Sequence, residues 1–148
     1  MSETAVEILL VEDNPNDREM TLRALRRSNV ANNVVTAGDG EEALDFLFAR
    51  GQYSGRKVDD APRVVFLDLK LPKVDGIEVL RMMRNDPRTR TIPVVIITSS
   101  AEERDRVASY AIGANSYVVK PIDSDSFTKT MAEVGYYWLA VNRGPLAP

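Results

Sequence analysis

The sequence predicts a single α/β domain, a (βα)5 doubly wound fold built on a five-stranded parallel sheet. Its 148 residues, 44% of them hydrophobic, suit one domain with a substantial core. Short apolar runs alternate five times with longer segments of helical periodicity. Several runs are almost continuously apolar, as expected of strands covered by helices on both faces. The expected strands are residues 6–11, 34–37, 64–67, 94–98 and 117–119.

The segments between these runs carry helix start signals. Asn14 before Pro15 is typical of an N-cap followed by a first-turn proline. Residues 39–42 and 100–103 have the spacing of a capping box, in which a short polar side chain precedes a glutamate by three positions. The last helix should continue to about residue 141, because its apolar side chains recur at steps of four and three. These side chains are Phe127, Met131, Val134, Trp138 and Val141.

Two segments lie outside this alternation. Residues 50–63 contain glycines, a proline and mixed charges, and we expect a long insertion loop there. Residues 142–148 contain Gly144 and two prolines, which predict a tail after the last helix. We therefore expect one domain over residues 1–148, with a core at about 6–141.

The composition excludes several classes of function. The chain has no His and no Cys, which removes histidine-based nucleophile systems, thiolate or imidazole metal sites and disulfides. The net charge of −3 gives no electrostatic reason to expect binding to nucleic acid or to an anionic membrane. We find no basic leader and no apolar stretch of membrane-spanning length, so we expect a cytoplasmic protein.

Polar side chains follow four of the predicted strands. Glu12 and Asp13 follow the first, Asp68 the third, Thr98 ends the fourth and Lys120 follows the fifth. Each alone has an ordinary explanation as a turn acid, a strand residue or a surface lysine. Together they fall at one edge of the sheet, where open α/β folds place their sites. Clustered carboxylates repel unless a cation joins them, and oxygen ligands favour Mg²⁺. A carboxylate there could act as a nucleophile towards phosphorus.

Four segments carry a family resemblance. Residues 11–14, 66–76, 96–100 and 114–122 resemble the motifs of the receiver domain of bacterial two-component response regulators. The similarity runs from about residue 6 to the last helix, nearly the whole chain. The chemotaxis member of that family has the flavodoxin-like strand order 2-1-3-4-5, and the resemblance implies the same order here.

The resemblance also implies roles for the residues at the strand ends. Asp68 would accept a phosphoryl group from the phosphohistidine of a sensor histidine kinase. Glu12, Asp13 and Asp68 would hold Mg²⁺ together with the backbone carbonyl of Lys70. Lys120 would bind the phosphoryl oxygens. Glu12 stands where many relatives have Asp, so its carboxylate reaches further from the backbone.

The resemblance further implies a switch. Thr98 would be the switch hydroxyl and Tyr117 the aromatic residue that changes rotamer with it, although packing alone also explains a tyrosine there. The Lys120–Pro121 bond would be a cis peptide. Ser100, two residues after Thr98, replaces the larger group that often stands there, which leaves the rate of autodephosphorylation open.

We expect a stand-alone regulator whose signal leaves through its surface. Phosphorylation would alter the face made by the fourth helix, fifth strand and fifth helix, and so change homodimer or partner binding. The aromatic residues 136–138 either cap the core or belong to an interface, in which Tyr137 and Trp138 would lie. This aromatic helix end and the 50–63 loop resemble the subgroup that serves bacterial and cyanobacterial phytochromes. The phosphodonor would then be a red-light-sensing histidine kinase.

Two alternatives stay open at the level of sequence. An aspartyl-phosphate phosphohydrolase usually has a second Asp two residues after the nucleophile, and this chain has Lys70 there. A receiver-like adaptor would bind partners without being phosphorylated. We expect a phosphoacceptor signalling protein and not an enzyme.

Overall fold

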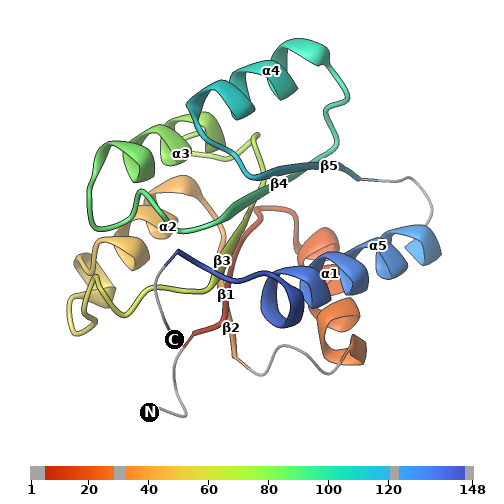
Figure 1. Cartoon of the computed structure of the whole chain (residues 1–148), viewed down its shortest axis with the longest axis horizontal. Helices are drawn as coiled ribbons and strands as arrows, with labels where there is room; N and C mark the ends of the chain where they lie inside the picture. The colour runs from red at the N-terminus through yellow and green to blue at the C-terminus, as the bar shows by residue number, and fades with distance from the viewer. Residues whose placement is uncertain (1–5, 29–32, 121–123, 146–148) are drawn as a thin grey trace.

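The computed structural model describes residues 6–28, 33–120 and 124–145. Five strands form one parallel sheet in the order β2-β1-β3-β4-β5, which confirms the predicted fold class and strand order (Figure 1). β1 lies between β2 and β3 in the sheet. The chain therefore adds β2 on one side of β1 and then adds β3, β4 and β5 on the other side. The strands are β1 (Ile8–Val11), β2 (Val34–Ala37), β3 (Val64–Leu67), β4 (Val94–Thr98) and β5 (Ser116–Val119).

Helices cover both faces of this sheet. In Figure 1, α1 and α5 lie together on one side, and α2, α3 and α4 lie on the other. None of the helices in the described part of the chain is long and apolar enough to cross a membrane. The helices are α1 (Pro15–Ser28), α2 (Gly40–Leu47), α3 (Gly76–Asn85), α4 (Glu103–Ile112) and α5 (Ser124–Tyr136), with the short turns η1 (Gly51–Tyr53) and η2 (Tyr137–Val141).

The strand residues alternate between two cores. Ile8 and Leu10 pack with buried side chains of α1 and α5, whereas Leu9 and Val11 pack with those of α2 and α3. Successive strand residues point to opposite faces, so a strand covered on both sides needs apolar residues at every position. This requirement explains why β1, β3 and β4 are continuous apolar runs in the sequence.

The first two helix starts follow the predicted chemistry. The Asn14 side chain accepts hydrogen bonds from the backbone amides of Asn16 and Asp17, as an N-cap of α1 should. Asp39 caps α2 by accepting from the amide of Glu42 at 2.7 Å. The Glu42 carboxylate in turn accepts from the amide of Gly38, so one amide in the first turn and one before the helix are both satisfied.

The predicted capping box at residues 100–103 is wrong. The helix α4 begins at Glu103, and its N-cap residue, Glu102, makes no side-chain cap hydrogen bond. Ser100 instead donates to the carboxylate of Asp105 at 2.6 Å and accepts from the amide of Glu102. Its hydroxyl therefore joins the end of β4 to the first turn of α4.

One further segment differs from expectation, and the expected loop at 50–63 has local structure that the sequence did not indicate. The last helix changes to a π-helical turn at Tyr137, which adds a residue to that turn and rotates the side chains that follow. Leu139 is consequently buried and Val141 is exposed, although the helical stripe predicted Val141 for the core. The 50–63 segment contains the short helix η1 and packs on α2, where Tyr53 contacts Phe46 edge to face at 5.1 Å.

Candidate functional site

Three carboxylates meet at the carboxyl edge of the sheet. Glu12 and Asp13 follow β1 and Asp68 follows β3, and the register that pairs Val11 with Leu67 brings the two strand ends side by side. One carboxylate oxygen from each of the three residues lies within 4.8 Å of the other two. Glu12 and Asp68 are 3% and 6% exposed, and Asp13 is exposed to solvent. The pair of adjacent strands therefore assembles the cluster that the sequence placed at this edge.

Lys120 extends from the end of β5 into this cluster. Its ammonium group lies 2.7 Å from the Glu12 carboxylate and 2.9 Å from that of Asp68, with only 11% of the side chain exposed. Since β4 separates β5 from β3, only a long side chain can bridge the two strand ends. The same ammonium group donates to Asp17 at 2.9 Å. Asp17, in the first turn of α1, was not among the site residues predicted from sequence.

Burial and ion pairing shift the protonation of these groups. Burial raises the pKa of the Glu12 carboxyl to about 7, although the hydrogen bond from Lys120 acts in the opposite direction. Burial by itself would lower the pKa of Lys120, but the hydrogen bonds to Asp17, Glu12 and Asp68 outweigh it. The pKa of Lys120 therefore lies above its ordinary value, and the ammonium group is charged whenever the site is assembled.

The turn after β3 fixes the orientation of Asp68. The backbone amide of Lys70 donates to the Asp68 carboxylate at 3.2 Å, and the amide of Gly76 donates to the Leu69 carbonyl at 2.8 Å. A Cβ at position 76 would collide with the Asp68 carbonyl and lie 2.7 Å from the Leu69 Cα. Only glycine permits this return of the chain, which places the start of α3 against the site. Lys70 and Asp13 line the same shallow surface groove.

Thr98 and Tyr117 both make hydrogen bonds with the main chain of Ser100. The Thr98 hydroxyl is fully buried and accepts from the Ser100 amide at 3.3 Å. The Tyr117 hydroxyl donates to the Ser100 carbonyl at 2.9 Å, and burial raises the pKa of this phenol. The two residues to which the resemblance gives switch roles are thus joined through one residue at the end of β4.

The two residues predicted to lie in an interface, Tyr137 and Trp138, differ in burial. Trp138 is only 9% exposed and packs in the core beneath α1 and α5, whereas Tyr137 is 48% exposed. Their rings meet edge to face at 5.1 Å. The predicted cis peptide involves Pro121, which lies outside the described residues, so Lys120 is placed but the bond after it is not.

The carboxylate cluster suits a hard divalent cation. Its donors are all oxygens, drawn from Glu12, Asp13 and Asp68, and they are close enough to share one ion. Two of the three are buried, and a cation would offset the repulsion that burial strengthens. The donor chemistry excludes the thiolate and imidazole ligands on which zinc and copper sites depend. The residues present therefore fit Mg²⁺ or Mn²⁺.

Comparison with known proteins identifies the family of the chain. Residues 8–132 match the family model described as the response regulator receiver domain. The probable methanogenesis regulatory protein FilR2 of Methanothrix harundinacea is 41% identical, over 93% of this chain and 86% of its own. Response regulator Rcp1 of Synechocystis sp. is 34% identical, over 95% and 93%.

Solved structures show the same relationship. The structure of the Mn²⁺-bound form of Rcp1 superposes with a TM-score of 0.87, covering 95% of this chain and 99% of that chain. The structure of the bacteriophytochrome response regulator AtBRR has a TM-score of 0.74 at 50% identity, covering 97% and 98%. With the fold, the edge cluster and the family model in agreement, the chain belongs to the receiver domain family of response regulators.

Proposed function

We propose that this response regulator is a phosphoacceptor in which Asp68 takes a phosphoryl group from the phosphohistidine of a sensor kinase. The observation that carries the proposal is the convergence on Asp68 of a buried ammonium group at 2.9 Å and two further carboxylates. The carboxylates supply a cation site and Lys120 supplies fixed positive charge. A nucleophile flanked by both is what phosphoryl transfer requires.

The transfer follows from the roles of these side chains. An oxygen of the Asp68 carboxylate attacks phosphorus, the P–N bond to the kinase histidine breaks, and the electron pair leaves with the imidazole nitrogen. Glu12, Asp13, Asp68 and the Lys70 carbonyl would hold a divalent cation, which we propose is Mg²⁺, and the cation would supply positive charge to offset the negative charge of the phosphoryl oxygens. Lys120 exchanges a carboxylate partner for a phosphoryl oxygen. The negative charge on the transferred group would then be offset by both the ammonium group and the cation.

The hydrogen bonds at Ser100 offer a route from this site to the surface. We propose that the Thr98 hydroxyl leaves the Ser100 amide to donate to the phosphoryl group, and that Tyr117 releases the Ser100 carbonyl and turns with it. Because the Ser100 side chain also binds Asp105, the first turn of α4 would move with this exchange. The face made by α4, β5 and α5 would then differ between the two states.

The kinase partner is proposed from the relatives. AtBRR, at 50% identity over nearly the whole of both chains, is a bacteriophytochrome response regulator, whereas FilR2, at 41%, carries a methanogenesis name. The higher identity favours a phytochrome histidine kinase as phosphodonor. We further propose that the protein acts in the cytoplasm as a homodimer and does not bind nucleic acid, in keeping with its net charge of −3.

Incubation with acetyl phosphate and Mg²⁺ tests the phosphoacceptor role. We expect intact-mass spectrometry to show one added phosphoryl group, which is absent in Asp68→Asn and absent when EDTA removes the cation. Asp59→Asn, a change of the same charge at an exposed position in the 50–63 segment, is the matched control and should be modified like the parent. Absence of modification in the parent would support the adaptor alternative, and steady turnover of organic phosphates would support a hydrolase.

A further inference from the structure

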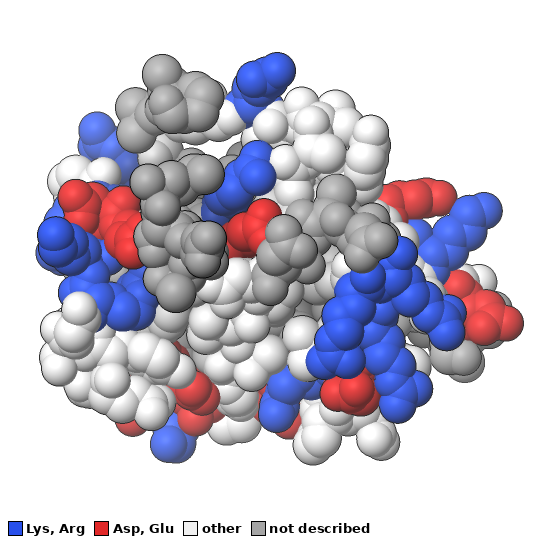
Figure 2. Space-filling view, turned by 90° about the horizontal axis from the view of Figure 1, so that it is seen from below, with Lys and Arg blue, Asp and Glu red and all other residues white. Residues whose placement is uncertain are grey.

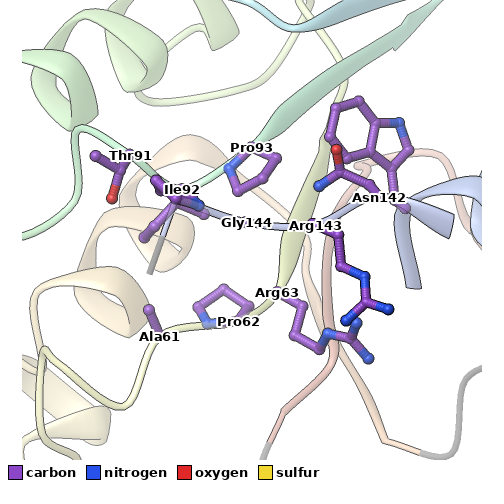
Figure 3. Close-up of a pocket in the computed structure, with 11 residues that line it drawn as sticks. Ala61, Pro62, Arg63, Thr91, Ile92, Pro93, Asn142, Arg143 and Gly144 are labelled. Carbon is purple, nitrogen blue, oxygen red and sulfur yellow. The ribbon is translucent and has the colours of Figure 1, made fainter. Parts of the chain in front are cut away.

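A cavity of about 470 Å³ lies at the opposite edge of the sheet from Asp68. It is bounded by the residues that precede β3 and β4 and by the segment that follows η2 (Figure 3). Figure 3 shows Arg63 and Arg143 on the same side of the cavity, opposite Thr91. Its apolar walls are Pro62, Ile92, Pro93 and Trp138.

A second lobe of about 430 Å³ adjoins the first. The two lobes share Pro93, Trp138 and the 142–145 segment, and the second adds Arg84 and Arg90. Their combined lining therefore contains four arginines, and no Asp or Glu among the described residues. This charge balance is unexpected for a protein whose net charge is −3, and the lobes together form an anion-attracting cavity.

The four guanidinium groups have no carboxylate partner among the described residues, whereas Arg23, Arg50 and Arg88 elsewhere all form ion pairs. In the described ranges, the Arg63 side chain donates to the backbone carbonyl of Leu139. Arg84 is half-buried, whereas Arg63, Arg90 and Arg143 are exposed.

Arg84 has one nitrogen that its surroundings leave without a partner. Its Nε donates to the Gly113 carbonyl at 3.0 Å and its Nη2 to the Asn115 side chain at 3.1 Å. Its Nη1 is buried and has no hydrogen-bond partner in the described part of the chain. These two acceptors of Arg84 are a backbone carbonyl and a side-chain amide, both neutral, so its positive charge at the wall of the second lobe is not offset by them.

We propose that this two-lobed cavity binds a small organic phosphate. Guanidinium groups bind phosphate through paired hydrogen bonds, and Arg84, Arg90 and Arg143 all line the second lobe. The apolar walls and the edge of Trp138 would cover the organic part of the ligand. The volume lies within the range of small-molecule pockets. The site is separate from Asp68, so its occupancy should not require the divalent cation.

Calorimetric titration with AMP and with inorganic phosphate, in EDTA, tests the proposal. We expect AMP to bind with a Kd of about 1 mM or tighter, and inorganic phosphate to bind more weakly because it lacks the organic part. Trp138 is the only tryptophan, so its fluorescence provides a second readout at the cavity wall. Arg143→Ala should raise the Kd for AMP about tenfold, and Arg143→Lys by less. Asp68→Asn should bind like the parent.

Arg27→Ala is the matched control, because it removes one positive charge from a different surface. Figure 2 shows basic side chains gathered at the right of the lower face, the side on which α1 lies in Figure 1. Arg26 and Arg27 are in the last turn of that helix. Three results would overturn the proposal: no binding of AMP, equal binding in Arg143→Ala variants whose thermal midpoint matches the parent, or loss of binding in Arg27→Ala instead. Equal affinity for inorganic phosphate and AMP would overturn the proposal that the apolar walls bind the organic part of the ligand.

Discussion

At the carboxyl edge of the sheet, the carboxylates of Glu12, Asp13, Asp17 and Asp68 lie around the ammonium group of Lys120. Lys120 donates to three of them, so it is the residue that holds the β1, α1 and β3 sides of the site together before a cation binds. A cation held by Glu12 and Asp68 would leave Asp17 as the carboxylate partner of Lys120.

Removal of the Asp17 charge should therefore weaken cation binding. In Asp17→Asn the ammonium group of Lys120 loses one partner and binds Glu12 and Asp68 more closely, where it competes with the cation. The negative potential of the site also falls. We expect the Kd for Mg²⁺ to rise about threefold, measured by isothermal titration calorimetry. Asp59→Asn is the control for charge alone, and an equal rise in both variants, or none in Asp17→Asn, would contradict the positioning role.

Much of this site was predictable from sequence, and Asp17 shows where prediction stopped. Glu12, Asp13, Asp68 and Lys120 each follow a strand, and parallel strands end at a common edge, so pattern and topology suffice to bring them together. Asp17 lies on a helix, where an acid in the first turn already has a sufficient explanation in the helix dipole. The contact of Asp17 with Lys120 depends on the conformation of the long lysine side chain, which a single sequence does not reveal.

At the scale of elements, the 50–63 segment is a packed attachment to α2 and not a free loop. Arg56 lies over the Phe46 ring with its guanidinium 3.7 Å from the ring centre, and its side chain also donates to the backbone carbonyls of Phe46 and Asp60. The Tyr53 hydroxyl donates to the Glu42 carboxylate at 2.9 Å. The segment therefore joins the helix through both its apolar and its polar groups.

The Tyr53 contact predicts a specific loss of stability in alkali. Burial, together with the hydrogen bond to Glu42, raises the pKa of Tyr53 to about 12 from a model-peptide value of 10.0. The folded state thus retains a proton that the unfolded state loses, so the free energy of unfolding falls as pH rises from 10 towards 12. Tyr53→Phe should show a shallower decline in the urea midpoint over this interval. Tyr136→Phe, at an exposed position, should decline like the parent, and parallel curves for all three proteins would refute the assignment.

The elements differ in how far local sequence determines them. The strands of the central sheet follow from apolar patterning, because burial on both faces leaves no other composition. The start of α4 does not, because the Ser100 hydroxyl can cap a helix or bind Asp105, and tertiary placement decides between them. The π-helical turn at residues 137–141 likewise changes which side chains face the core without leaving a signal in the apolar periodicity.

At the scale of the whole molecule, exposed apolar side chains are concentrated on the later elements. Val107 and Tyr110 on α4 and Val119 on β5 are 41% to 59% exposed, and Tyr136, Tyr137 and Val141 at the end of α5 are 48% to 55% exposed. Such residues are costly to leave in water, and a second copy of the chain would cover them. The homodimer that we propose would use this side of the molecule.

Tyr137 offers the cleanest test of that dimer. Trp138 is buried, so its truncation would cost about 3–5 kcal/mol of folding free energy and confuse assembly with unfolding. Tyr137→Ser removes an exposed ring, and we expect the dimer dissociation constant, measured by sedimentation equilibrium, to rise about tenfold. Met82→Ser, at an exposed apolar position on α3, should leave it unchanged. Measurements with and without acetyl phosphate show whether phosphorylation strengthens the dimer. A parent protein that is monomeric in both states would remove the homodimer, and an unchanged Tyr137→Ser dimer would place its interface elsewhere on the surface.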